Sequence, residues 1–210
     1  DGLEYLFGVH YLLDGQPVFK PFWAHNHQEE RAAFQQFMAF LDEHLLAHPN
    51  AHIYHYNHYE TTALKRLAGR YAACEEQLDN LLRGHVFVDL YVVVREALRT
   101  SEPGYSIKNM ETFYMEKRDN EVANAVDSIV AYNTWRETGD DALLRDIAAY
   151  NEEDCVSTQL LRDWLLGLMP TAAGERLAAH ETSDGGPRER KPWEVEYAAY
   201  QERLGMFTEE

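Results

Sequence analysis

The stretch Tyr150-Asn151-Glu152-Glu153-Asp154-Cys155 lies inside residues 141–166, where apolar residues recur at helical spacing. Tyr150 and Asp154 are four residues apart, so they lie one above the other on the same face of the expected helix. A carboxylate on that face can hold a hard metal ion, and the neighbouring phenol can orient a water molecule. The alternative is a half-buried tyrosine beside a solvated acid. Other residues of the chain are needed to choose between the catalytic and the structural interpretation.

The composition is that of a globular protein with a strong negative charge. The chain has 210 residues, 45% of them apolar, and a formal charge of −17. That charge disfavours nonspecific binding to nucleic acid, which depends on Lys and Arg, but it allows an enzyme that holds cations with carboxylates. No apolar run reaches the length of a membrane span, and Cys74 and Cys155 lie far apart. We therefore expect a cytoplasmic protein with no membrane partner and no disulfide framework.

The predicted strands begin with a hairpin. Aromatic and β-branched residues predict strands over 4–13 and 18–24, joined by Asp14-Gly15. Pro17 and Pro21 place the second of these strands at a sheet edge or make it irregular. Two shorter strands are expected, over 52–56 and 85–90.

Helical spacing accounts for most of the remaining chain. The predicted helices cover 28–47, 59–71, 75–83, 90–98, 106–113, 121–137 and 141–166. Strands and helices in this order predict an α/β fold with helices on the faces of the sheet. We expect one domain over 1–168, followed over 169–210 by a linker and the start of another region.

A second acidic position follows the strand over 52–56. Glu60 stands in the first turn of the next helix, close to Asn57. Open α/β sheets bind ligands beyond the carboxyl ends of their strands, so a carboxylate here is well placed. A glutamate is also favoured at this position by the helix macrodipole, and the residues alone leave both interpretations open. The three nearby histidines lack a further ligand at zinc spacing, so we do not expect zinc.

A third acidic position, Asp89, lies near the end of the strand over 85–90. A carboxylate there either borders an active site or caps the helix that follows. The residues alone favour neither interpretation.

Several cations lie near these motifs and are candidates for phosphate contacts. Lys65, Arg66 and Arg70 follow Glu60, and Lys108 belongs to the aromatic segment 105–114. Nearby aromatic rings could stack on unpaired bases. A solvated helix face is the simpler interpretation of any one of these cations.

Four stretches together carry a resemblance to a known nuclease family. They are HIYHYNHYETTALKRL (52–67), HVFVDLYVVVR (85–95), YSIKNMETFY (105–114) and YNEEDCVSTQLLRDWL (150–165). In order and spacing they resemble the RNase-H-like nuclease domain of the predicted RecB-like nuclease family, which is often joined to a helicase. More broadly, they resemble the DEDDy group of 3′–5′ exonucleases. The resemblance covers roughly residues 3–168.

The resemblance implies roles for individual residues. The third exonuclease motif, Y-x-x-x-D, matches Tyr150 and Asp154. The second, H-N-x-x-F-D followed by a leucine, is matched by Asn57, Tyr59, Glu60 and Leu64, with glutamate in place of aspartate. Tyr150, Asp154 and Glu60 are then the catalytic residues, and Glu60 and Asp154 hold metal.

The remaining site residues are assigned more loosely. Asp89 lies where relatives often have an aspartate, which makes it a further metal ligand. Asn57, Lys65 and Lys108 are the expected substrate contacts.

The resemblance also implies a fold and a cofactor. The fold is RNase-H-like, of the 3′–5′ exonuclease type: an α/β structure with a mixed sheet flanked by helices. The cofactor is Mg²⁺ or Mn²⁺, which prefer carboxylates, and two ions about 4 Å apart supply positive charge to the attacking and leaving oxygens. The family's first motif, Asp-x-Glu on the first core strand, is not matched, since Asp1 and Glu4 have the wrong spacing. We expect that strand to lie upstream of Asp1.

The expected function is therefore a divalent-metal-dependent nuclease, a 3′–5′ exonuclease acting on DNA rather than RNA. A helicase-type domain is expected in the same chain or in a partner. The alternative is a catalytically incomplete module of the same fold that binds nucleic acid or docks a partner, which the acidic charge and the unmatched first motif favour. Other hydrolases find no support, because the sequence has no G-x-S-x-G, P-loop or H-E-x-x-H motif.

Overall fold

The computed structural model describes residues 2–116 and 125–169. The chain divides into two compact units, Asp1–Leu165 and Leu166–Glu210. Of the second unit, only residues 166–169 are described, and they include the end of helix α7 (Asp141–Leu168). The linker predicted by composition within 169–210 lies outside the described residues.

A β-hairpin opens the fold. β1 (Leu6–Leu13) and β2 (Gln16–Trp23) pair antiparallel. Asp14 and Gly15 both have positive φ, as a two-residue hairpin turn requires. Within the described residues β2 pairs only with β1, so the edge position predicted from its prolines is confirmed.

The second sheet is a short parallel pair, β3 (Ile53–His55) and β4 (Phe87–Asp89). No ladder joins the two sheets within residues 2–116 and 125–169, so the single mixed sheet that was predicted is not observed there. The strands stop after three residues because helices begin almost at once, at Tyr59 after β3 and at Leu90 after β4. The result is still a mixed α/β structure.

The described residues form seven helices. They are α1 (His27–Ala47), α2 (Tyr59–Tyr71), α3 (Glu75–Arg83), α4 (Leu90–Ala97), α5 (Ile107–Glu111), α6 (Ala125–Thr138) and α7. The predicted bounds of α2 and α3 are confirmed. The ends of the other helices lie within a few residues of the prediction. The predicted start of α6 falls on residues that are not described. Side chains of Asn26 and Ser106 cap α1 and α5, which explains where these helices begin. No helix in the described ranges is long and apolar enough to cross a membrane.

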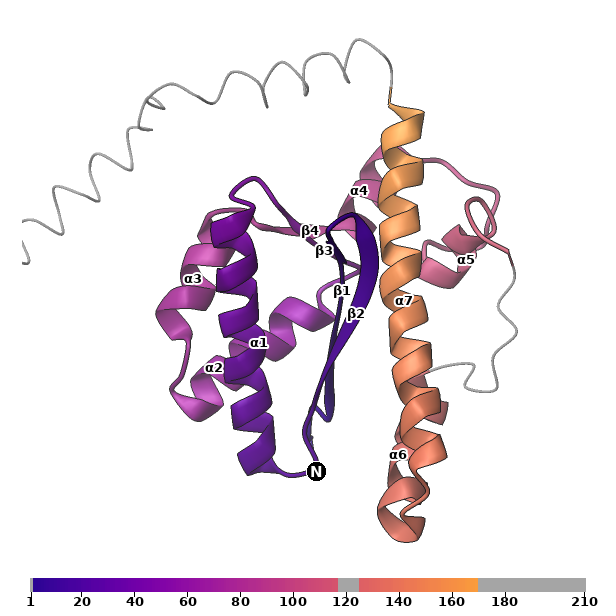
Figure 1. The fold of residues 1–210 in the computed structure, drawn as a ribbon. Helices are drawn as coiled ribbons and strands as arrows, with labels where there is room; N and C mark the ends of the chain where they lie inside the picture. Colours follow the sequence, from indigo (N-terminus) through magenta and orange to yellow (C-terminus); the bar gives the residue numbers. More distant parts are fainter. Residues whose placement is uncertain (1, 117–124, 170–210) are drawn as a thin grey trace, which may run out of the picture. The chain divides into compact units, whose positions relative to one another are not determined.

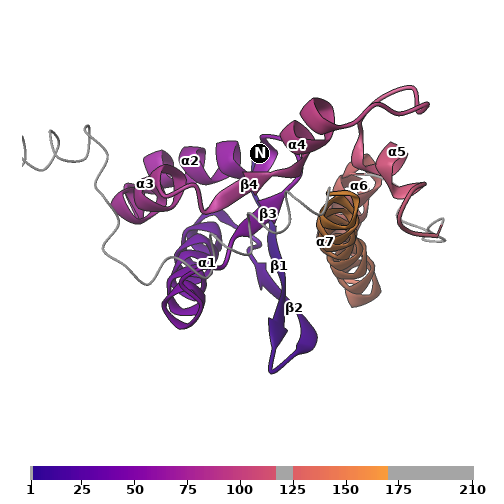
Figure 2. The same ribbon diagram turned by 90° about the horizontal axis from the view of Figure 1, so that it is seen from above.

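The hairpin lies between α1 and α7, as both views show (Figures 1 and 2). On the α1 side it joins a core that includes Phe22, Phe34 and Met38. On the α7 side the contact is very close: a Cβ built on Gly8 of β1 would lie 1.8 Å from Oδ1 of Asn151. Only glycine fits at this position, and the close approach fixes the middle of α7 against β1.

A second core joins α4 and α5 to the carboxyl-terminal half of α7. Its fully buried members are Leu90, Val94, Met110 and Leu161. Half-buried rings such as Tyr54 and Trp164 pack around them. This core holds the short helix α5 on α7.

Candidate active site

The carboxyl ends of β3 and β4 carry two of the predicted site segments. His55 and Asp89 are register partners at the last position of the parallel pair. Asp89 caps α4, because its Oδ1 accepts the backbone N–H of Tyr91 (2.9 Å). The same oxygen accepts the backbone N–H of Asn57 (2.9 Å), which has a positive φ of 73°. The capping interpretation of Asp89 is confirmed, while its Oδ2 accepts no hydrogen bond from the described residues.

Glu60 faces the buried His55. Oε2 of Glu60 lies 3.6 Å from Nδ1 of His55, and 48% of the Glu60 side chain is exposed. The same Nδ1 donates its hydrogen bond to the carbonyl oxygen of Asn57, at 2.7 Å, so its contact with Glu60 is electrostatic. Burial lowers the pKa of His55, but the neighbouring Glu60 carboxylate and the Asn57 carbonyl outweigh it, and the net pKa is raised. Glu60 thus keeps a partly exposed carboxylate with one oxygen held by a histidine.

The other acidic segment is presented by α7, where it touches β1. Sγ of Cys155, next to Asp154, lies 3.8 Å from the carbonyl oxygen of Gly8. Burial, together with the nearby carboxylates of Asp154, Glu60 and Glu152, raises the pKa of the Cys155 thiol to about 12. The middle of α7, which carries the Y-x-x-x-D motif, thus lies against β1.

The predicted cations fall into two groups. Lys108 reaches the site: its Nζ lies 5.9 Å from the ring centroid of Tyr150, within cation–π range. Lys65 is exposed on α2. Arg66 and Arg70, which were candidates for phosphate contacts, instead hold the N-terminal segment, since both donate to the carbonyl oxygen of Gly2 (3.2 and 3.3 Å).

These two arginines also pair with carboxylates. Arg66 binds Glu4, which accepts a further hydrogen bond from the Tyr59 hydroxyl (2.9 Å). Arg70 binds Glu30 (3.1 Å), whose side chain is fully buried. Long-range ion pairs of this kind leave no local signal in the sequence.

The donor chemistry of the predicted metal ligands fits a hard divalent ion, because Glu60, Asp89 and Asp154 all offer carboxylate oxygens. The thiol of Cys155 faces the Gly8 carbonyl of β1, and its raised pKa disfavours the thiolate form that binds soft metals. In the part of the chain that the structure describes, no three His, Cys, Asp or Glu side chains gather closely enough to hold an ion by themselves. The structure therefore shows suitable donors without a complete metal centre among these residues.

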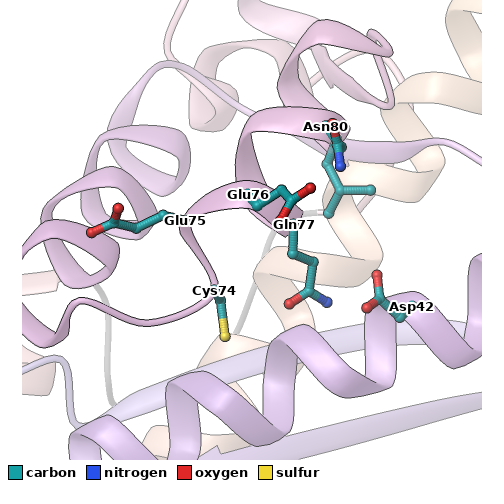
Figure 3. A pocket seen from close by; sticks show the side chains of 7 residues that line it. Asp42, Cys74, Glu75, Glu76, Gln77 and Asn80 are labelled. Atoms are coloured by element: carbon teal, nitrogen blue, oxygen red, sulfur yellow. The ribbon is translucent and has the colours of Figure 1, made fainter. Parts of the chain in front are cut away.

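A separate hollow of about 470 Å³ lies between α1 and the start of α3 (Figure 3). Its lining residues are Asp42, Cys74, Glu75, Glu76, Gln77, Asn80 and Leu81. None of the predicted site residues lines it. We therefore place the candidate site at the sheet edge and on α7.

Comparison with known proteins identifies the family of the chain. A family model described as the RNase H superfamily matches residues 1–166. The chain belongs to the RNase H superfamily. Membership in the RNase H superfamily implies a nuclease-type activity, and RNase-H-like nucleases usually use divalent metals. Neither the curated proteins nor the solved structures give a significant match.

Sequence reasoning missed two contacts around the site. His55 was considered only as a zinc ligand, although it is the partner of Glu60. The buried hydrogen bond from Ser157 to Glu111 (2.8 Å), which ties α5 to α7, was not anticipated. A serine three residues after Asp154, on the same face of the helix, was the available signal for the second contact.

Proposed function

We propose that this RNase H superfamily protein is a divalent-metal-dependent nuclease, specifically a 3′–5′ exonuclease of the DEDDy, RecB-like type acting on DNA. The proposal is supported by the match of residues 1–166 to the RNase H superfamily. The Y-x-x-x-D spacing on α7 and the partly exposed carboxylate of Glu60 at the start of α2 supply residues of the expected chemistry. A helicase-type domain in the same chain or a partner is part of the proposal, by family resemblance.

The proposed roles follow from the chemistry of each side chain. Glu60 and Asp154 would hold Mg²⁺ or Mn²⁺, and Asp89 would add its Oδ2, because its Oδ1 is occupied by two backbone N–H groups. Such ions, when bound, supply positive charge to the attacking and leaving oxygens of the phosphodiester.

Tyr150 acts through its hydroxyl. It stands one helical turn before Asp154 on the same face of α7. A phenol both donates and accepts hydrogen bonds, so it can orient a water molecule beside the carboxylate. Asn57, Lys65 and Lys108 are the proposed substrate contacts.

The test uses the full-length protein with Mg²⁺ or Mn²⁺ and strands labelled at either the 5′ or the 3′ end. A 3′–5′ exonuclease releases the 3′ label first as mononucleotides and shortens the 5′-labelled strand progressively. Parallel reactions on single-stranded DNA, double-stranded DNA and RNA decide the substrate. Binding without cleavage under all of these conditions would instead identify a noncatalytic nucleic-acid-binding module.

Asp154→Asn tests the site itself. We expect a loss of more than about 100-fold in cleavage, because even residues that merely support a metal ligand cost ~10–100-fold. Asp163→Asn is the matched control, since Asp163 is an exposed acid on the same helix that pairs with Arg162. Equal activities of the two variants would reject the assignment of Asp154.

A further inference from the structure

The buried His55 lies where the segments of two proposed metal ligands meet. It is the last residue of β3, only 7% exposed, and it is the register partner of Asp89 at the end of β4. Its Nδ1 lies 2.7 Å from the carbonyl oxygen of Asn57. A carbonyl oxygen only accepts hydrogen bonds, so this Nδ1 carries the hydrogen and is not itself a metal ligand. The imidazole thus acts as a buried donor at the edge of the sheet.

Asn57 connects His55 to Asp89. Its carbonyl oxygen accepts the His55 Nδ1–H, and its backbone N–H donates to Oδ1 of Asp89 (2.9 Å). Asn57 has a φ of 73°, a left-handed conformation that is uncommon outside glycine. Hydrogen bonds on both sides of Asn57 therefore fix the turn between β3 and α2, and with it the start of α2 relative to β4.

The same imidazole faces the carboxylate of Glu60. Oε2 of Glu60 lies 3.6 Å from Nδ1 of His55, which is beyond hydrogen-bond distance but close enough for the N–H to attract a negative charge. His55 is the only ion-pair partner of Glu60 in residues 2–116 and 125–169. Almost half of the Glu60 side chain is exposed, so little else restricts its rotamer. His55 therefore keeps this carboxylate beside the carboxyl ends of β3 and β4.

We propose that His55 is a positioning residue of the site, which holds Glu60 and, through Asn57, Asp89 in an arrangement that binds a divalent ion. This inference rests on the proposed nuclease function and adds to it a residue that acts through the ligands. The alternative is a histidine that only stabilises the turn between β3 and α2. A positioning residue changes the metal affinity of the folded protein, whereas a purely structural one changes the free energy of unfolding alone.

The experiment measures Mn²⁺ binding by the full-length protein, without nucleic acid, from the electron paramagnetic resonance signal of free Mn²⁺. His55→Phe keeps a ring near Phe87, whose centroid lies 6.1 Å from that of His55, and removes the N–H donor. The affinity for Mn²⁺ should fall about 10-fold, the low end for residues that support metal ligands, because the contact with Glu60 is longer than a hydrogen bond. Saturating Mn²⁺ should restore most of the cleavage.

Two amide variants test the position of the donor. The amide nitrogen of asparagine stands close to where Nδ1 of histidine lies, whereas that of glutamine reaches further, to the place of Nε2. Both amides donate hydrogen bonds. His55→Asn should therefore recover most of the Mn²⁺ affinity, and His55→Gln should not. Equal affinities of the two variants would contradict the inference, even if His55→Phe fails to fold.

A double-mutant cycle with Glu60→Gln tests whether His55 acts through this carboxylate. In the Glu60→Gln background, His55→Phe should lose most of its effect on Mn²⁺ affinity, because the two residues share one interaction. Independent effects of the two changes would show that His55 does not position Glu60.

His52→Phe is the matched control, since His52 is an exposed histidine that directly precedes β3. Its Mn²⁺ affinity should equal that of the wild type, and thermal unfolding should show that each variant is folded. Unchanged affinity in folded His55→Phe, or an equal loss in His52→Phe, would overturn the inference while leaving cleavage by the wild-type protein intact. Failure of the wild-type protein both to bind Mn²⁺ and to cleave nucleic acid would instead reject the proposed function.

Discussion

Two groups of carboxylates near α2 have very different interaction partners. In the arginine-bound group, Glu4 pairs with Arg66, and Glu30 pairs with Arg70. Glu30 also accepts hydrogen bonds from the Tyr71 hydroxyl and the backbone N–H of Glu4. Each of these acids is therefore neutralised within the protein.

The sheet-edge group consists of Glu60, Asp89 and Asp154. Glu60 contacts a histidine, and Asp89 accepts two backbone N–H groups. Within the described residues, neither Glu60 nor Asp89 forms an ion pair with Arg or Lys. The difference teaches that the fold gives its structural acids an arginine partner, whereas these two sheet-edge acids have no such partner among the described residues, as the proposed metal site requires.

The largest expected effect is the loss of stability in Glu30→Ala. This change leaves Arg70 without its buried partner, and we expect a loss of about 3 kcal/mol, the low end of the range for broken buried pairs because Arg70 is 35% exposed. Glu60→Ala should change the free energy of unfolding by less than about 0.5 kcal/mol. Urea denaturation measures both. Similar losses in the two variants would erase the distinction between the groups.

The next effect concerns the close contact that seats α7. Gly8→Ala places a Cβ 1.8 Å from Oδ1 of Asn151 and 2.8 Å from the ring of Phe19, so we expect a loss of about 1–3 kcal/mol in the free energy of unfolding. Cleavage should fall as well, since Asn151 adjoins Tyr150. Gly69→Ala is the control: its Cβ meets nothing within 4 Å in helix α2, and we expect a gain of about 0.5–1 kcal/mol. A neutral Gly8→Ala would show that the helix is free to shift.

Asp89→Ala separates capping from metal binding. Removal of the cap should cost about 1 kcal/mol, as it should for Asn26→Ala at the start of α1. Thermal or chemical unfolding checks that the two costs match. If Asp89 is also a ligand, only its replacement should lower cleavage at limiting Mn²⁺. If Asp89→Ala and Asn26→Ala lose similar stability and cleave equally well, Asp89 has only a structural role.

The smallest effect is a pH dependence that belongs to the arginine-bound group. Burial alone would raise the pKa of Glu30, but hydrogen bonds from Tyr71, the Glu4 N–H, His27 and Arg70 outweigh it, and the pKa lies below its ordinary 4.5. A lowered pKa contributes stability that is present above pH 4.5 and is lost as the pH falls through the folded value. The difference in unfolding free energy between wild type and Glu30→Gln should therefore shrink below that pH. A difference that stays constant with pH would contradict the ionised state of Glu30.

Local patterns predicted the helices well because each helix buries its own periodic face. The bounds of α2 and α3 are examples, as are the Ser106 cap of α5 and the Asp14-Gly15 turn. The sheet was less predictable, since pairing between strands depends on contacts distant in sequence. β3 and β4 are short because helices α2 and α4 begin soon after them, at Tyr59 and Leu90, which a run of β-branched residues does not reveal.

The candidate site shows the same difference between local patterns, which the sequence reveals, and long-range contacts, which it does not. The Y-x-x-x-D spacing placed Tyr150 and Asp154 on one face of α7, as any helix must. The sequence did not show that Arg66 and Arg70 bind Glu4 and Glu30, because these partners are 62 and 40 residues away. Lys108 was expected to contact the substrate, but its place near the Tyr150 ring depends on how α5 packs, which the sequence does not show.

The contact between α7 and β1 can be monitored through the reactivity of the Cys155 thiol. The thiol of Cys155 faces the Gly8 carbonyl and has a pKa of about 12, so it is almost unreactive while helix and strand stay together. Alkylation of this thiol requires the helix to lift from the strand, and the labelling rate therefore counts such openings. Mass spectrometry of the labelled peptide would give the local opening free energy at the place where Tyr150 and Asp154 are held.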